Sequence, residues 1–169
     1  IGFMFEGCTS LQSIDVSGFD TSKVEEIRGV FTDCASLKQL DLRAWDFNRV
    51  NTVLWNNGGK YEGANAYYAS GMITDSGVRE LYAPAVFLQH VDMTLPPEWD
   101  GDTPVSGGNI APNLQKVYYA GTSAQWAEQV IKLPQNVQLI CDYSGEMNAP
   151  ADYVTGITLD ADKLTKKIS

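Results

Sequence analysis

Histidine, the most frequent acid–base catalyst in enzymes, occurs once in this sequence of 169 residues. The one histidine, His90, lies in FLQHVDM, and no GxSxG motif is present to hold an activated serine beside it. A single histidine also cannot build a histidine-rich metal site. Acidic side chains could converge as the carboxylate pair of a glycosidase, and the candidates are Glu62, Glu80, Asp92, Glu98, Asp100 and Asp102. Because no spacing among them favours such a pair, we predict no enzyme, no catalytic residue, no metal site and no cofactor.

Aromatic side chains offer a different chemistry, the stacking of sugar rings. Trp99 lies in PPEWDGD, while Trp55, Tyr67 and Tyr68 lie in a segment rich in Gly, Asn and Tyr. Their broad apolar faces would suit a carbohydrate. A carbohydrate-binding module is therefore our alternative for the function.

The elements that must position these residues follow from a repeat. Residues 4–29 (MFEGCTSLQSIDVSGFDTSKVEEIRG) align with residues 30–55 (VFTDCASLKQLDLRAWDFNRVNTVLW) at a shift of 26 positions. The identical pairs are Phe5 and Phe31, Cys8 and Cys34, Ser10 and Ser36, Leu11 and Leu37, Asp15 and Asp41, Asp20 and Asp46, and Val24 and Val50. A fixed period of about 20 to 50 residues indicates a solenoid.

Each copy contains the Leu-x-x-Ile/Leu-x-Val/Leu pattern of a leucine-rich-repeat strand, which begins at Leu11 and Leu37. The frame recurs from Val78, Leu114 and Val137, with insertions at 55–77 and 84–113. We predict an α/β solenoid: a right-handed leucine-rich-repeat-like stack with one parallel sheet of about five strands. Short helices or irregular segments should cover the other face.

Two helices are predicted between these strands. In the first copy, Ser22 and Glu25 have the spacing of a capping box, so we expect a helix to begin there. A second helix is expected over 122–131, where Trp126 and Val130 would pack inward. The solenoid should span 1–143 and end in a cap at about 114–143. Residues 144–169 should form a linker and an isolated tail strand at 153–160.

Alternation along the strands places one column of side chains outward. It consists of Asp15, Asp41, Tyr82 and Tyr118. The tyrosines could form an exposed contact surface or pack against each other across the strands. The neighbouring column is Ser13, Gln39, Glu80 and Lys116. The two aspartates should form a solvated acidic face tempered by Lys38 and Arg43, since two carboxylates are too few oxygens for Ca²⁺.

The other matched polar positions have structural interpretations. Asp20 and Asp46 should accept hydrogen bonds from local backbone N–H groups in turns. Cys8 and Cys34 should lie about 5 Å apart in stacked turns, close enough for a disulfide. We favour two buried thiols filling the core, because free cysteine is often buried.

Composition narrows the range of partners. The formal net charge of −9 argues against binding nucleic acid, which rewards clustered Lys and Arg. No apolar run of about 18 residues is present, so we expect no membrane insertion. The chain begins inside a repeat-like unit, because Met4-Phe5 aligns with Val30-Phe31, and we expect it to be a fragment or a processed chain.

The repeats resemble those of BspA-like leucine-rich-repeat proteins of bacterial surfaces. The resemblance lies in Met-Phe-x-x-Cys-x-Ser-Leu, in Ile/Leu-Asp-Val/Leu, and in the Phe-Asp-Thr-Ser-Lys-Val element from Phe19 to Val24. The stretch from Val117 to Trp126 is similar to the end of many arrays in that family. The tail VTGITLD is similar to the first strand of bacterial immunoglobulin-like modules.

This resemblance implies an extracellular or cell-surface location and a non-catalytic role. The expected function is protein–protein interaction or adhesion to host or neighbouring cells. The partner would be a host or bacterial surface protein, and the sequence does not identify it. The candidate binding surface comprises the outward column and the aromatic residues of the insertions: Asp15, Asp41, Tyr82, Tyr118, Trp55, Tyr67, Tyr68 and Trp99.

Overall fold

The computed structural model describes most of the chain up to residue 148. The described residues are 1–27, 29–52, 72–73, 75–87, 99–100, 103–104, 113–129, 131 and 133–148. Side chains are described for all of these except 51–52, 99–100 and 103–104. The expected tail strand at 153–160 lies outside this set.

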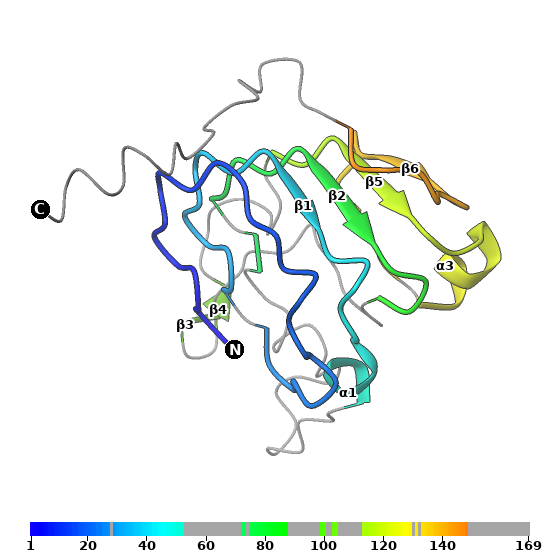
Figure 1. Cartoon of the computed structure of the whole chain (residues 1–169), viewed down its shortest axis with the longest axis horizontal. Coiled ribbons are helices and arrows are strands. Elements are labelled where there is room, and N and C mark those ends of the chain that lie inside the picture. Colours follow the sequence, from blue (N-terminus) through cyan, green and yellow to red (C-terminus); the bar gives the residue numbers. More distant parts are fainter. Residues whose placement is uncertain are drawn as a thin grey trace, which may run out of the picture.

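Four short strands form one parallel sheet. They are β1 (Gln39–Asp41), β2 (Glu80–Ala83), β5 (Lys116–Tyr119) and β6 (Gln138–Ile140), in the order β1-β2-β5-β6. Figure 1 shows them side by side, with the N-terminal segment on the β1 side and helix α3 (Ser123–Gln129) at the other end. The remaining elements are helix α1 (Asn48–Thr52) and an antiparallel pair, β3 (Trp99–Asp100) with β4 (Thr103–Pro104).

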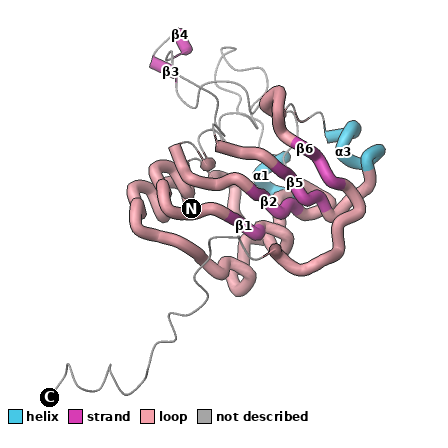
Figure 2. The backbone as a smooth tube through the Cα atoms, turned by 90° about the horizontal axis from the view of Figure 1, so that it is seen from above, coloured by secondary structure: helices cyan, strands magenta, loops and turns pink. Residues whose placement is uncertain are grey.

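The register confirms the predicted frame. Leu40 is aligned with Leu81, and Leu81 with Val117, and none of these three side chains is exposed to solvent. Because side chains alternate between the faces of a strand, this alignment turns their neighbours outward. Loops make up most of the described chain between the strands (Figure 2).

Outside the strands, backbone hydrogen bonds also join each unit of the repeat, which we call a turn of the stack, to the next unit. Phe5 N–H donates to Val30 O at 2.9 Å, and Gly7 N–H donates to Thr32 O at 2.9 Å. In the next turn, Phe31 N–H donates to Met72 O at 2.8 Å. This arrangement and the parallel sheet are compatible with an α/β fold. The solenoid and the domain boundary after residue 143 stay predictions.

The strand expected at 11–16 is absent from the structure, so the described sheet has four strands rather than about five. The end of this segment makes other hydrogen bonds instead of pairing with β1. The Asp15 carboxylate accepts from Ser17 N–H at 2.9 Å, and Val16 O accepts from the Trp45 indole N–H at 3.1 Å. Such bonds compete with strand pairing, and residues 11–16 form an irregular segment that is followed by a turn at 17–18.

One of the two predicted helices is present. The prediction of a helix after Ser22 is wrong, because residues 21–27 contain no helix. Ser22 donates to Asp20 at 2.7 Å, and Glu25 pairs with Arg49 of the next turn. The helix predicted at 122–131 is confirmed as α3 over 123–129.

Helix α3 is held against the sheet by polar contacts. Helix α3 begins with a reciprocal pair, in which Gln125 N–H donates to Thr122 Oγ1 at 3.2 Å and Thr122 N–H donates to Gln125 Oε1 at 2.8 Å. The buried Gln129 accepts from Phe87 N–H at 2.6 Å and donates to the Tyr119 hydroxyl at 2.7 Å. Helix, sheet and the segment after β2 are thus joined through one amide.

Aromatic rings at equivalent positions of the repeat lie against each other. The Phe5 and Phe31 rings stack at 5.3 Å between centroids, and Phe19 stacks on Trp45 at 6.3 Å. Both pairs are the ones that the 26-residue shift aligns. The stacking explains why these positions keep aromatic residues in both copies.

Replacement of Gly77 by alanine tests how closely successive turns approach. A Cβ at this buried glycine would lie 2.2 Å from Ala35 O and 2.9 Å from Leu37 O, both backbone atoms. We expect Gly77→Ala to lower the free energy of unfolding by about 1–3 kcal/mol, measured by urea denaturation. Gly18→Ala is the matched control, since nothing lies within 4 Å of its Cβ position, and it should change stability by less than about 0.5 kcal/mol. Equal stability of the two variants would contradict the close approach.

Candidate functional site

The predicted outward column is partly assembled by the sheet. Asp41, Tyr82 and Tyr118 are aligned on β1, β2 and β5. The Tyr82 and Tyr118 rings stack at 4.6 Å with an interplanar angle of 12°. Asp15 is not part of the sheet and lies in the irregular segment before β1.

The expectation that these tyrosines form an exposed surface is wrong. Tyr82 has no exposed surface, and Tyr118 is 6% exposed. The alternative, cross-strand packing of the two rings, is confirmed. The physical reason for their burial is that the chain after β6 returns over them.

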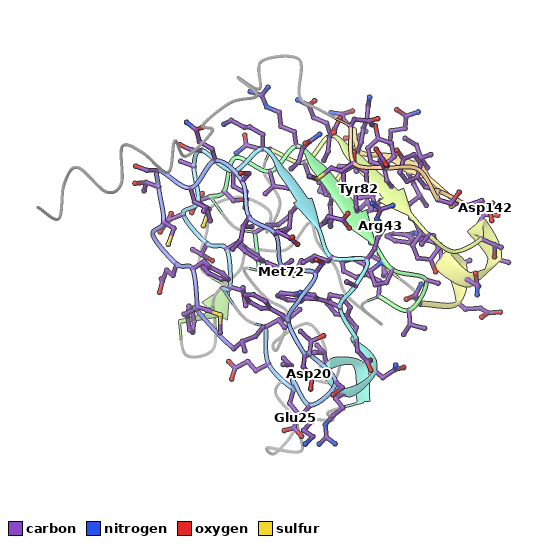
Figure 3. All side chains as sticks on the ribbon, viewed as in Figure 1. Asp20, Glu25, Arg43, Met72, Tyr82 and Asp142 are labelled. Carbon is purple, nitrogen blue, oxygen red and sulfur yellow. The ribbon has the colours of Figure 1, made fainter. Side chains whose placement is uncertain are left out.

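Tyr143 begins this return. Its backbone N–H donates to Tyr119 O at 2.9 Å, and its ring lies 4.6 Å from Tyr118 and 5.7 Å from Tyr82. The Arg43 guanidinium lies 5.2 Å from the centre of the Tyr82 ring and 5.9 Å from that of Tyr143, within range of a cation–π contact. Arg43 and Tyr82 are seen together over the sheet in Figure 3.

Residues 144–148, which we call the strap, then cross the outward face of the sheet. Five side chains, which we call the sheet-face cluster, each make one hydrogen bond to it: Gln39, Arg43, Tyr82, Tyr118 and Tyr143. Sequence reasoning expected these strap residues to be part of a linker. The structure places them against the candidate binding surface.

Four of the five bonds involve the main chain of the strap. Arg43 donates to Gly145 O at 2.6 Å, Tyr143 donates to Glu146 O at 2.6 Å, and Gln39 donates to Asn148 O. Asn148 N–H donates to the Tyr82 hydroxyl at 2.9 Å. The fifth bond joins the Asn148 side-chain amide to the Tyr118 hydroxyl at 3.0 Å. The cluster therefore recognises an extended backbone and one amide side chain.

The strap is held with little apolar burial. All five of its residues are exposed, including Met147 at 42%. Ordering the backbone costs about 1–2 kcal/mol per residue. A hydrogen bond contributes about 0.5–1.5 kcal/mol net, or about 1.5–3 kcal/mol when one group is charged. These contributions nearly cancel over five residues and five bonds, so release of the strap would cost mainly the exposure of the Tyr82 and Tyr118 surface that it covers.

The cluster beneath the strap is fixed by contacts of its own. Arg43 donates to both carboxylate oxygens of Asp41, at 3.0 and 2.7 Å. Burial opposes ionisation of Asp41, but the bonds from Arg43 outweigh it and lower the pKa of this carboxyl. Gln39 donates to Glu80 at 2.6 Å. These contacts hold the residues of the cluster in place without using the strap.

The sequence predicted that Lys38 and Arg43 would offset the negative charge of the two aspartates, and one of these two residues does so. Arg43 pairs with Asp41, whereas Lys38 donates to Ala35 O at 2.9 Å. Asp15 bonds to the hydroxyl and N–H of Ser17, which lowers the pKa of Asp15. The aspartates are engaged locally.

The other matched polar residues are structural. Asp20 and Asp46 accept backbone and side-chain bonds from the residues two positions ahead, which confirms their predicted role in turns. All three cysteines are free. Cys34 is buried and donates to Phe5 O at 3.1 Å, and burial raises the pKa of this thiol. Cys8 is exposed, so the prediction of two buried thiols is right only for Cys34.

Several predicted residues cannot be assigned to this surface. Trp55, Tyr67, Tyr68 and His90 lie outside the described residues, and only the backbone of Trp99 is described, in β3. Conversely, sequence reasoning did not select Gln39, Arg43, Tyr143 or Asn148 for the site. The strand register could have pointed to Gln39, because it places Gln39 beside Glu80. The spacing of two residues between Asp41 and Arg43 could have pointed to their ion pair. Nothing in the pattern identified Asn148.

Within the described part of the chain, no three His, Cys, Asp or Glu residues are grouped so that they could hold a metal ion. No helix among those residues is long and apolar enough to cross a membrane. Beside the tyrosines, Arg43 pairs with Asp41, and Glu80 accepts from Gln39 and from the Tyr82 hydroxyl.

Comparison with known proteins gives one match. Residues 1–60 match a family described as "Mycoplasma protein of unknown function, DUF285". The matched region includes both copies of the repeat and covers 60 of the 169 residues, so it shows similarity over the N-terminal third of the chain. It loosely supports a bacterial surface repeat protein and does not single out BspA-like repeats. No curated protein and no solved structure gives a significant match.

Alkaline pH should weaken the structure through Tyr82. Burial, with smaller effects of Glu80 and the neighbouring tyrosines, raises the pKa of Tyr82 to about 12, compared with about 10 in an unfolded chain. The folded state thus holds this proton more tightly. Its contribution, about 2–3 kcal/mol, is fully present below about pH 10 and is lost as pH rises from about 10 to 12.

Urea denaturation of wild type and Tyr82→Phe at several pH values between about 8 and 12 tests this, because the range begins about two units below the pKa of tyrosine in an unfolded chain and ends at about that of Tyr82. The phenylalanine variant lacks the titrating group. Its free energy of unfolding should fall less steeply above about pH 10. Parallel curves for the two proteins would contradict the raised pKa.

Proposed function

We propose that this chain is a non-catalytic module of a bacterial surface protein that binds other proteins, in adhesion to host cells or to neighbouring cells. The observation that carries the proposal is the occupied sheet face. The sheet-face cluster already holds five residues of polypeptide, mostly through their main chain. A surface with this chemistry suits a protein partner.

The rigidity of the support favours the same function. The cluster stands on strands whose backbones are bonded in register, and the stacked Tyr82 and Tyr118 rings limit its side-chain freedom. Preorganised side chains lose little entropy on binding. Tyrosine and arginine are also enriched among the residues that dominate protein interfaces.

Two findings support the proposed location of the protein on a bacterial surface. Residues 1–60 are similar to a bacterial family, and the repeat in that region resembles surface proteins of the BspA-like kind. The negative formal charge of −9 suits an outer surface that stays solvated. The non-catalytic part is supported by the engagement of Asp41 and Arg43 with each other.

The test uses the full chain against two panels, immobilised extracellular-matrix proteins and a glycan array. We expect saturable binding to at least one protein and no glycan signal. Arg43→Ala should weaken that binding by about tenfold or more, as expected for loss of an interface anchor. Lys23→Ala, an exposed change away from the sheet, is the matched control and should leave binding unchanged.

Other results would overturn the proposal. A glycan signal that is lost in Trp55→Ala or Trp99→Ala, without protein binding, would establish the carbohydrate-binding alternative. Protein binding that survives Arg43→Ala would place the interface away from the sheet-face cluster.

A further inference from the structure

The geometry points to a specific ligand for the sheet-face cluster: an extended peptide of the form Gly-Xaa-Xaa-Asn, donated by a partner protein, for which the strap is a replaceable occupant from the same chain. The inference rests on the proposed function and adds the chemistry of the partner and its competition with the strap.

The strap is bound as a peptide ligand would be. Its carbonyl groups at Gly145, Glu146 and Asn148 each accept one bond from the cluster, and the N–H of Asn148 donates one to Tyr82. Main-chain contacts of this kind accept many sequences, while side-chain contacts give selectivity. The middle positions, Glu146 and Met147, have exposed side chains, so the surface would tolerate variation there.

Two positions of the ligand are restricted. A Cβ at position 145 would lie 2.8 Å from the Tyr143 hydroxyl oxygen and 2.9 Å from the ring carbon that bears it, so any other residue would have to displace the end of the Tyr143 side chain, and this position favours glycine. At position 148, the side-chain amide meets the Tyr118 hydroxyl at 3.0 Å. An apolar residue there would leave that hydroxyl without this partner. The spacing of these two requirements defines Gly-Xaa-Xaa-Asn.

The cluster does not depend on the strap for its arrangement. Arg43 is fixed by Asp41 and by the Tyr82 ring, and Tyr143 is fixed by its backbone bond to Tyr119. A site that is organised before binding can exchange one extended segment for another. The strap, exposed along its length, shields these polar groups until a partner peptide replaces it.

The test measures a labelled peptide, Ser-Gly-Glu-Met-Asn-Ala-Pro, by fluorescence anisotropy against full-length chains. Asn148→Pro removes both the N–H that meets Tyr82 and the amide that meets Tyr118, so it should free the site. We expect this variant to bind the peptide about tenfold more tightly than wild type, because the wild-type site is occupied for most of the time. Met147→Ala, which removes no bond to the cluster, should bind as wild type does.

A double-mutant cycle then locates the peptide on the cluster. In the Asn148→Pro chain, Tyr118→Phe should weaken binding by about fivefold, and the peptide with alanine in place of asparagine should lose a similar factor. Combining the two changes should cost no more than either one alone, because both remove the same bond. Circular dichroism of each variant confirms that the fold is retained.

Three outcomes would overturn the inference. They are equal affinity of wild type and Asn148→Pro, additive losses in the cycle, and dimers of the Asn148→Pro chain that bind no peptide. The last would reserve the surface for the strap of a second copy. If matrix-protein binding persists while peptide binding is absent, the proposed function stands and this inference falls. If the peptide binds but no protein in the panel does, the inference stands and the adhesive function falls.

Discussion

Backbone hydrogen bonds join the main chain of each turn to the turn beside it, and the rest of the structure depends on this constraint. Strands β1, β2, β5 and β6 satisfy it by parallel pairing. Outside the strands, the same task is performed by single bonds such as Phe5 N–H to Val30 O and Gly77 N–H to Cys34 O. Buried peptide groups without partners are costly, so neighbouring turns are held at a fixed distance. That distance in turn sets the stacking of the aromatic rings and excludes a side chain at Gly77.

The parts of the fold that the sequence predicted are those with long-range periodicity. The frame beginning at Leu37, Val78, Leu114 and Val137 gave four strands, and it aligned Tyr82 with Tyr118 correctly. It failed at Leu11, where a local choice decided the outcome: Asp15 and Trp45 satisfied nearby polar atoms better than a strand pairing would. The helix predicted from the capping pattern at Ser22 is absent for a related reason, since the N–H and the hydroxyl of Ser22 both donate to Asp20. Short-range hydrogen bonding of Asp and Ser competes with helices and strands, and periodicity does not register it.

The residues of the candidate site that lie on the sheet could be predicted from the sequence, but the strap that covers them could not. Alternation along the strands brings Asp41, Tyr82 and Tyr118 to one face, and this follows from sequence alone. The burial of those tyrosines follows from a segment whose composition resembles a linker and whose contacts are mostly main-chain. Almost any residue can make main-chain contacts of this kind, so the residue types do not reveal them. Residue type matters at two positions, at Gly145 because a Cβ would meet the Tyr143 ring and at Asn148 because its side-chain amide bonds to Tyr118. Two residues are too few to form a recognisable pattern.

The amide of Gln129 has a consequence for how this chain can vary. It joins Phe87, which follows β2, to Tyr119, which ends β5. The start of the segment that connects these strands is therefore fixed by one side chain from a third element, and its end is fixed by the bonds that Gln115 N–H and Lys116 N–H donate to Arg79 O. Lengthening a connection whose ends are already held costs little, because closure entropy grows only with the logarithm of its length. A repeat protein built in this way can acquire a new surface loop between two turns while the register of its sheet stays unchanged.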